Sequence, residues 1–321
     1  MDTKKRSTVI GAALIFIGIL AGTLQGCQQT PEGRFPFLRV PQGGISKPEQ
    51  TTAALPAGPA SPGSISFSAM DAKKAVIRYA DDCGYRVNIA KLVQKELDWA
   101  LTGEKPTVLI LHTHASESYT RQPGQNYKES SQYRTLDRAF NMVALGDKLT
   151  ALLEQAGISV IHDRQIHDYP SYNDSYDNSR MSAQDYLERY PSIQVVLDLH
   201  RDAVLLSDGS QYAPTIEVEG KEVAQVMMVV GSDASGMVHP HWQDNLAAAL
   251  KLQVLMEKAA PGITRPTILR AQRFNHDLSA GAMIVEIGTA GNTFQQAMGA
   301  VPVLADAIIG LMYGAKASST S

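Results

Sequence analysis

The sequence predicts an α/β fold, a mostly parallel twisted sheet with helices on both faces. Two observations lead to this class. Short apolar runs rich in Val, Ile and Leu alternate along the chain with segments whose apolar residues recur at helical spacing. Several of these runs also end on His or carry Glu, at the strand ends where open α/β sheets bind ligands. With 321 residues, the chain has room for one large domain and accessory segments.

The first 27 residues are predicted to be a targeting segment and membrane anchor. Basic residues at positions 4–6 precede an apolar stretch over residues 9–24. Basic residues stay on the cytoplasmic side, so the rest of the chain is expected outside the cytoplasm. Leu24-Gln-Gly-Cys27 resembles a bacterial lipobox, which would make Cys27 a lipidated residue. An uncleaved signal anchor is the alternative, and either form tethers the chain to a membrane.

Residues 28–72 are predicted to be a flexible linker, residues 73–315 the catalytic domain, and residues 316–321 a tail. The linker is rich in Pro, Gly, Ser, Thr and Ala. Such a composition buries too little apolar surface to offset the entropy lost on ordering.

The domain is predicted to alternate strands and helices in order. A strand over 107–111 precedes a helix that begins near residue 136 and ends at Gly157, and a short helix ends before Pro191. Two longer helices are expected over 240–259 and 293–313. The other expected strands are 158–161, 193–199, 215–218, 226–230, 267–270 and 283–287.

Charge and cysteine content exclude several classes of protein. A net charge of −3 with 19% charged residues gives no reason to expect a nucleic-acid partner. Two cysteines, Cys27 and Cys83, form neither a disulfide framework nor a four-cysteine zinc site.

The stretch after the strand over 107–111 is the first candidate for chemistry. His112, His114 and Glu117 follow that strand within six positions. Residues two apart on a strand share a side, so His112 and His114 are expected to point the same way. One of the two histidines is expected to bind metal with Glu117, and the other to support it.

The strand over 193–199 leads into His200, a second metal-ligand candidate. Asp198 precedes His200 by two positions and is expected to orient its imidazole. Arg201 is a candidate for holding a substrate carboxylate or a developing oxyanion, because its guanidinium matches carboxylate geometry.

Glu286 lies inside the apolar strand over 283–287, where an unpaired carboxylate is costly. Burial raises the pKa of a carboxyl, which suits a general base acting on water. Two His, one ligand Glu and a second Glu as base are the inventory of a catalytic zinc site. An edge-strand Glu facing solvent is the alternative.

The remaining histidines are less telling. His162 and His167 lie in a polar region and are expected in solvated or loop positions. His239 opens a helix, where it lines a groove or caps the helix, and His276 is a candidate for substrate contact. No Gly-x-Ser-x-Gly elbow, phosphate loop, dinucleotide fingerprint or His-Glu-x-x-His helix occurs in the sequence.

Four linked motifs, in order over residues 73 to 314, resemble the stage II sporulation protein P family. They are His112-Thr-His-Ala-Ser-Glu-Ser-Tyr119, Asp198-Leu-His-Arg-Asp202, Val230-Gly-Ser with His239-Pro-His-Trp242, and Asn275 with Glu286-Ile-Gly-Thr-Ala-Gly-Asn-Thr293. This family looks like a branch of the zinc-dependent N-acetylmuramoyl-L-alanine amidases. The resemblance therefore implies an amidase-like fold and, within the first motif, favours His114 over His112 as ligand.

The resemblance implies a peptidoglycan hydrolase of engulfment during sporulation, with amidase activity and endopeptidase activity on the peptide cross-links. Zn²⁺ is the implied cofactor, with His114, Glu117 and His200 as ligands, His112 as the fallback and Glu286 as base. In the general amidase family the ligand Glu lies at the start of the first helix. This chain has no Glu there, and Glu117 takes its place in the hypothesis.

The implied partners are the lytic transglycosylase stage II sporulation protein D and the membrane protein stage II sporulation protein M. The expected location is the cell membrane at the sporulation septum, with the catalytic domain outside the cytoplasm. The alternative function is a non-catalytic peptidoglycan-binding or assembly subunit that keeps the fold. The complete set of His, Glu, His and Glu argues against that alternative, and the N-terminal segment argues against a cytosolic metallopeptidase.

Overall fold

The computed structural model describes residues 76–97, 99 and 104–318. The elements are β1 (Tyr79–Asp81), α2 (Ile89–Gln94), β2 (Val108–Leu111), β3 (Glu129–Ser131), β4 (Arg134–Thr135), α3 (Met142–Gln155), β5 (Val160–His162), α4 (Ser175–Arg189), β6 (Val195–Asp202), β7 (Thr215–Val218), β8 (Lys221–Ala224), β9 (Val226–Gly231), α5 (Trp242–Ala259), β10 (Thr267–Arg270), the 3₁₀ helix η1 (His276–Leu278), β11 (Ala282–Thr289) and α6 (Phe294–Ser318). The predicted anchor over 1–27, with Cys27, and the predicted linker over 28–72 lie outside the described residues.

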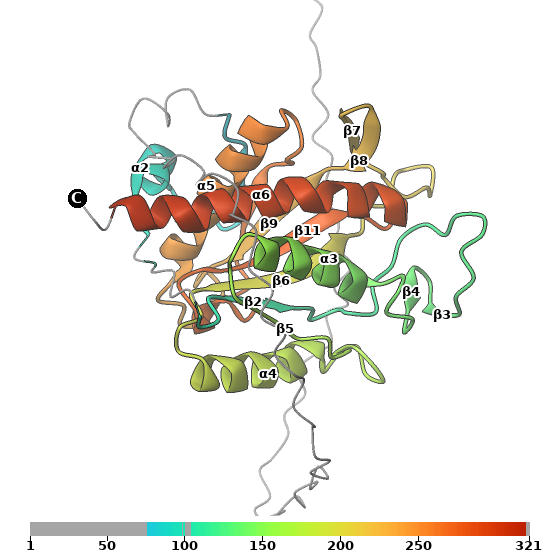
Figure 1. Ribbon diagram of the computed structural model, residues 1–321, viewed down its shortest axis with the longest axis horizontal. Coiled ribbons are helices and arrows are strands. Elements are labelled where there is room, and N and C mark those ends of the chain that lie inside the picture. Colours follow the sequence, from blue (N-terminus) through green and yellow to red (C-terminus); the bar gives the residue numbers. More distant parts are fainter. Residues whose placement is uncertain (1–75, 98, 100–103, 319–321) are drawn as a thin grey trace, which may run out of the picture. The chain divides into compact units, whose positions relative to one another are not determined.

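The central sheet has seven strands in the order β1-β10-β9-β11-β6-β2-β5 (Figure 1). Neighbouring strands are parallel except at β9–β11, which pair antiparallel. The prediction of a mostly parallel sheet is confirmed. The exception divides the sheet into two parallel blocks that run in opposite directions.

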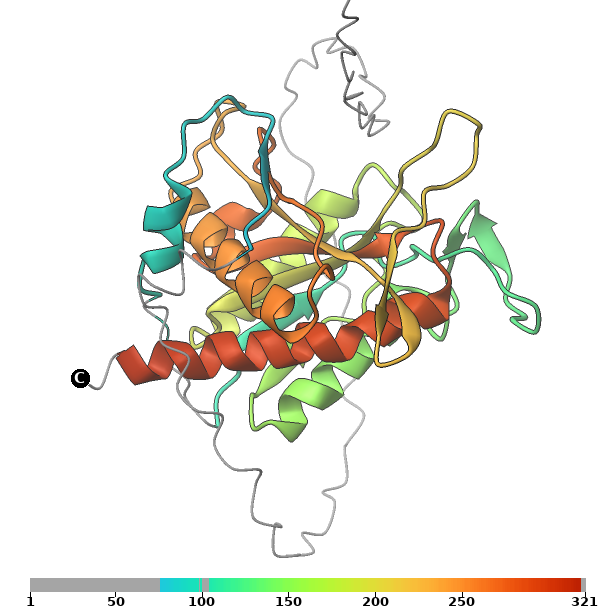
Figure 2. The same cartoon turned by 90° about the horizontal axis from the view of Figure 1, so that it is seen from above.

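Helices cover both faces of this sheet, as predicted. Helices α3, α5 and α6 contribute to one large apolar core with residues such as Leu197, Leu199 and Val285, and Figure 2 shows α6 running beside α5. Helix α4 packs on the other face through Ala183, against Leu109 and its neighbours. Alternation along the strands divides their side chains between these two faces.

Within the described part of the chain, α6 is the helix long and apolar enough to cross a membrane, over Phe294–Tyr313. It packs against α3, α5 and β8, and more than half of this stretch is buried. This packing accounts for its apolar sequence as that of a core helix.

Three element boundaries differ from the prediction. Helix α3 begins at Met142 rather than near residue 136, because the side chain of Asn141 accepts a hydrogen bond from the Val143 N–H (3.0 Å) and caps the helix there. Strand β6 continues to Asp202, so His200 lies inside a strand. Helix α4 begins at Ser175, inside the polar stretch over residues 170–180 from which the sequence predicts the helix to follow.

Gly146 on α3 allows the helix to approach two buried imidazoles. A Cβ at this position would lie 2.7 Å from His112 Nε2 and closer still to His162 Nε2. Those two nitrogens are 2.8 Å apart and hydrogen-bonded, so neither ring can move away freely. A glycine is therefore required here despite its low helix propensity.

We expect Gly146→Ala to lower the free energy of unfolding by about 1–3 kcal/mol, the usual cost of overpacking a core. Urea unfolding at constant m-value measures this change. In a His162→Ala background the same substitution should cost less, because the space is then open. Equal costs in both backgrounds would contradict the steric explanation.

Candidate active site

The candidate site lies on the face of the sheet that carries α4. Asp198 and His200 on β6 alternate with the core residues Leu197 and Leu199, so they project from the opposite face. Strand β11 pairs with β6 in parallel, and its register places Glu286 beside His200. Residues 86 positions apart in the sequence are thus brought together by one pair of strands.

His114 reaches the same place from the turn that follows β2. Its ring meets the His200 ring edge-on at 5.2 Å between centroids and stacks on Tyr172 at 4.5 Å. Tyr176, from the first turn of α4, contacts it edge-on at 5.6 Å. His114 Nδ1 is buried, and no group among the described residues bonds to it.

Glu117 is held by two arginines and by backbone. Its Oε2 accepts a hydrogen bond from the Arg201 backbone N–H (3.1 Å), and its Oε1 accepts one from Arg134 (3.2 Å). Burial by itself would raise the pKa of this carboxyl. The positive charges, with Arg201 first among them, instead lower the pKa of Glu117 to about 2. Glu117 is therefore ionised and oriented at neutral pH.

His200 lies between two carboxylates. Its Nε2 is 2.9 Å from Asp198 Oδ1, and its Nδ1 is 3.6 Å from Glu117 Oε2. Asp198 is itself fixed by the Thr113 N–H (2.8 Å) and hydroxyl (2.6 Å). This contact agrees with the expectation that Asp198 orients the imidazole of His200.

Glu286 completes the group. One of its carboxylate oxygens, Oε2, is buried and has no hydrogen-bond partner among the described residues. Burial, reinforced by the negative charge of Asp202, raises the pKa of Glu286 to about 8. A carboxyl with a pKa near neutrality can both accept and return a proton, which is the behaviour of a general base and acid.

The structure does not bring His112 to this group. Strand β2 ends at Leu111, so the alternation that would align His112 with His114 does not continue. The ring of His112 instead lies against α3, with Nε2 on His162 (2.8 Å) and Nδ1 on the Leu199 carbonyl (3.3 Å). The expectation that the two histidines point the same way is wrong.

Arg201 is almost fully buried and its side chain is engaged. Its Nε donates to the Ser118 carbonyl (3.0 Å), and its guanidinium also donates to the Tyr133 carbonyl (3.1 Å) and lies 3.6 Å from Glu117. These contacts favour a role in holding Glu117, and contact of Arg201 with substrate stays a prediction.

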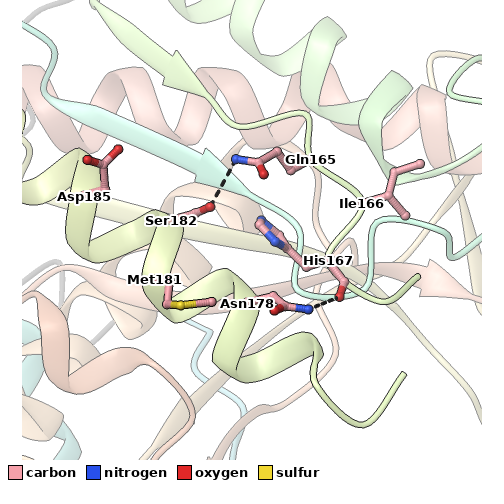
Figure 3. Close-up of a pocket in the computed structure, with 7 residues that line it drawn as sticks. All are labelled: Gln165, Ile166, His167, Asn178, Met181, Ser182 and Asp185. Carbon is pink, nitrogen blue, oxygen red and sulfur yellow. Dashed lines mark hydrogen bonds between the residues drawn. The ribbon is translucent and has the colours of Figure 1, made fainter. Parts of the chain in front are cut away.

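Both side chains are buried, so the expectation of solvated positions is wrong for His162 and His167, whereas the expected loop position of His167 is confirmed. His162 bonds to His112, and His167 Nε2 bonds to Asp163 at 2.9 Å. A cavity of about 420 Å³ lies beside His167, along the outer side of α4 (Figure 3). Its lining contains none of the residues that surround His200, so this cavity is separate from the candidate site.

Sequence reasoning missed Arg134, Asp168, Tyr172 just before α4, and Tyr176 in its first turn. Arg134 bridges Glu117 and the fully buried carboxylate of Asp168 (2.6 Å), and its guanidinium lies over the Tyr172 ring at 4.8 Å. No spacing in the sequence connects Arg134 with residues near 168–176. The one available signal is the pair Tyr172 and Tyr176, which is one helical turn apart in an otherwise polar stretch.

The donors near His200 fit zinc in kind, since imidazole and carboxylate are its usual ligands alongside thiolate. Two ligand atoms on a tetrahedral zinc, each about 2.1 Å away, lie roughly 3.4 Å apart. His200 Nδ1 and Glu117 Oε2 are separated by a similar distance, 3.6 Å. Over the described ranges, however, no three His, Cys, Asp or Glu side chains are already arranged as a closed metal site.

The site is thus a cluster of two histidines and three carboxylates on one face of an open α/β sheet. A family model for stage II sporulation protein P matches residues 63–309, most of the chain. The chain therefore belongs to the stage II sporulation protein P family. The stage II sporulation protein P of Bacillus subtilis is 28% identical over 225 residues, 66% of this chain and 53% of that protein. The chain thus spans about half the length of this curated relative.

Solved structures of two peptidoglycan amidases are similar to the chain. The CwlD amidase of Clostridioides difficile, in complex with the GerS lipoprotein, is 11% identical with a TM-score of 0.38, covering 67% of this chain and 98% of that one. The N-acetylmuramyl-L-alanine amidase Ami1 of Mycobacterium smegmatis is 11% identical with a TM-score of 0.39, at the same coverage of 67% and 98%. The proposals below rest on the family and on the residues of the site.

We expect Arg134→Met to lower the free energy of unfolding by about 3 kcal/mol, because it leaves the Asp168 carboxylate buried without its cation. Arg164→Met is the matched control, since Arg164 pairs with Asp147 where both side chains are half exposed. That control should cost less than about 1 kcal/mol. Chemical unfolding of both variants checks the difference, and equal losses would contradict the buried-pair explanation.

Proposed function

We propose that the chain is a zinc-dependent N-acetylmuramoyl-L-alanine amidase that hydrolyses peptidoglycan during engulfment, with endopeptidase activity on the peptide cross-links. The observation that carries this proposal is the proximity of three side chains to His200: the His114 ring at 5.2 Å, the Glu117 carboxylate at 3.6 Å, and Glu286 beside it in the strand register. Membership of the stage II sporulation protein P family supports the cell wall of a sporulating cell as the setting.

The proposed zinc ligands are His114, Glu117 and His200. A zinc ion, when bound, supplies Lewis acidity that lowers the pKa of water and polarises a scissile carbonyl. Asp198 fixes the orientation of His200, leaving Nδ1 turned toward Glu117. Arg201 and Arg134 keep Glu117 ionised and in place.

Glu286 is the proposed proton carrier. Its carboxylate takes a proton from the attacking water and passes that proton to the amine that leaves. The unpartnered Oε2 is the atom available for this transfer, and the raised pKa of Glu286 suits both directions. Its place beside His200 in the strand register sets it next to the proposed ligands.

Tethering of the domain outside the cytoplasmic membrane belongs to the same proposal, as do the partners stage II sporulation protein D and stage II sporulation protein M. The support for all three is the family and the N-terminal sequence.

Metal analysis of purified variants tests the ligand set. We expect the wild-type chain to retain about one equivalent of zinc and His114→Ala or His200→Ala to lose most of it. His112→Gln is the control and should keep the metal, because His112 faces His162. Retention of zinc by both alanine variants would contradict the ligand assignment.

Hydrolysis of purified peptidoglycan tests the base. Glu286→Gln should lower the rate by about 10²–10⁴-fold, the usual contribution of general acid–base catalysis, while zinc content is unchanged. Glu222→Gln makes the same chemical change on an exposed strand and should retain full activity. The assay detects new amino groups, and their identity separates amidase cleavage, which frees L-alanine, from cleavage of cross-links. Wild-type rates for Glu286→Gln would overturn the role of Glu286.

A further inference from the structure

The mechanism above leaves two buried histidines, His239 and His276, without a task. His239 is 2% exposed and His276 is 3% exposed. Both nitrogens of His239 and Nε2 of His276 are buried and lack hydrogen-bond partners among the described residues. Unmade hydrogen bonds of this kind are costly, so each requires an explanation.

The tautomer of His276 is set by the backbone. Its Nδ1 accepts a hydrogen bond from the Gly231 N–H at 3.0 Å. Burial lowers the pKa of His276 to about 3, so the ring is neutral and carries one proton. That proton must be on Nε2. His276 therefore presents a fixed N–H donor that has no acceptor among the described residues.

His276 is anchored as well as oriented. Asn245, at the start of α5, donates from Nδ2 to the His276 carbonyl (2.9 Å) and accepts at Oδ1 from the Ala282 N–H (3.1 Å). A neighbouring ring, Phe274, contacts the imidazole at 5.3 Å between centroids. A donor held this firmly has lost its conformational entropy before any ligand arrives.

A series of aromatic ring contacts connects His276 to the candidate active site. Phe274 contacts Tyr176 (5.8 Å), and Tyr176 contacts His114 (5.6 Å). The strand register gives the distance along the sheet. Glu286 on β11 pairs with Met227 on β9. Gly231, which holds His276, is four residues further along β9, roughly 13 Å from the level of Glu286. An extended peptide of about four residues spans that length.

His239 opens the same region to solvent. It lines a cavity of about 310 Å³ together with Asp233, Gly236, Met237, Val238 and Pro240. His239 is also close enough to His276 for the two rings to interact electrostatically. The cavity gives a ligand access to His239, and through it to the neighbouring His276.

The charges around the pair decide what kind of oxygen it accepts. Asp198 and Asp277 act on His276, and Asp233 and Asp277 act on His239, where Arg273 opposes them. Asp277 is itself ion-paired with Arg180 (2.8 Å) and Arg273 (3.4 Å). Because charges of both signs surround the pair, a neutral donor at this place suits an uncharged amide carbonyl.

We propose that His239 and His276 bind an amide carbonyl oxygen of the peptide stem, about four residues along the sheet from Glu286, and so select the bond presented to the active site. This proposal rests on the proposed function for the identity of the peptide. The pair acts in positioning and takes no part in proton transfer.

Two substitutions of His276 separate substrate binding from a structural role. The His276→Gln side chain places an amide N–H near the position of Nε2 but loses the acceptor for the Gly231 N–H. The His276→Asn side chain keeps an acceptor near the position of Nδ1 but loses the donor at Nε2. Titration calorimetry of a synthetic stem tetrapeptide into the full chain carrying Glu286→Gln, loaded with zinc, measures binding without turnover. We expect His276→Asn to weaken binding on the order of tenfold and His276→Gln to stay within about threefold.

The opposite order, with Asn retaining binding and Gln losing it, would show that His276 merely satisfies Gly231 and would overturn the proposal. Equal binding by both would overturn it too. If either variant unfolds, His239→Phe takes its place and must also weaken binding about tenfold. Met181→Ala, on the exposed side of α4, is the control and should bind as the parent does. A peptide ending in an amide should bind as well as the free acid, and strict dependence on the acid would contradict a carbonyl ligand.

Kinetics on peptidoglycan keep this proposal distinct from the proposed function. In the otherwise wild-type chain, His276→Asn should raise KM with kcat little changed, because the lost contact is made equally in ground and transition states. Loss of kcat alone would overturn the positioning role. If the wild-type chain does not hydrolyse peptidoglycan but the peptide still binds through His276, the proposed function fails and the binding site stands.

Discussion

The parallel pairing of β6 with β11 is the constraint on which the site depends. Each strand buries alternate residues in the large core, such as Leu199 and Val285, and the residues between them project from the other face. Packing of the core therefore fixes the height and direction of His200 and Glu286. A shift of either strand by one residue would move its polar side chain, His200 or Glu286, into the core, and the loss of buried apolar surface opposes that shift.

Charge balance is the second organising interaction. Glu117 is buried, yet Arg201 and Arg134 hold its pKa near 2. Glu286 has no cation at hydrogen-bond distance within the described part of the chain, and its pKa is near 8. The surroundings thus lower the pKa of Glu117 and raise the pKa of Glu286. This difference is the physical basis for assigning one as ligand and the other as proton carrier.

Much of this was accessible from sequence, because strand periodicity reports directly on burial. The runs ending near His112, His200 and Glu286 predicted three strands correctly, and parallel pairing then brings their ends together. The start of α3 was wrong because Leu136 and Phe140 continue the helical spacing upstream of the Asn141 cap. The direction of His112 was wrong because it depends on where β2 ends.

The contacts of Arg134 with Asp168 and of His112 with His162 were not accessible, since nothing local in the sequence specifies which loop meets which. Such pairs are set by tertiary packing alone. The burial of His162 and His167 has the same cause. The polar residues around them indicate exposure, but Asp147 of α3 contacts His162, and Asp163 contacts His167 within the loop where it was expected.

The antiparallel junction between β9 and β11 has a consequence for how such a protein can change over evolution. Because the two parallel blocks run in opposite directions, the turn that carries His114 and the loop that carries His239 emerge from opposite ends of the sheet. An insertion in one loop therefore lengthens the chain at one end of the sheet and leaves the strand ends at the other end in place. The two loops can then vary in length and sequence independently on one scaffold.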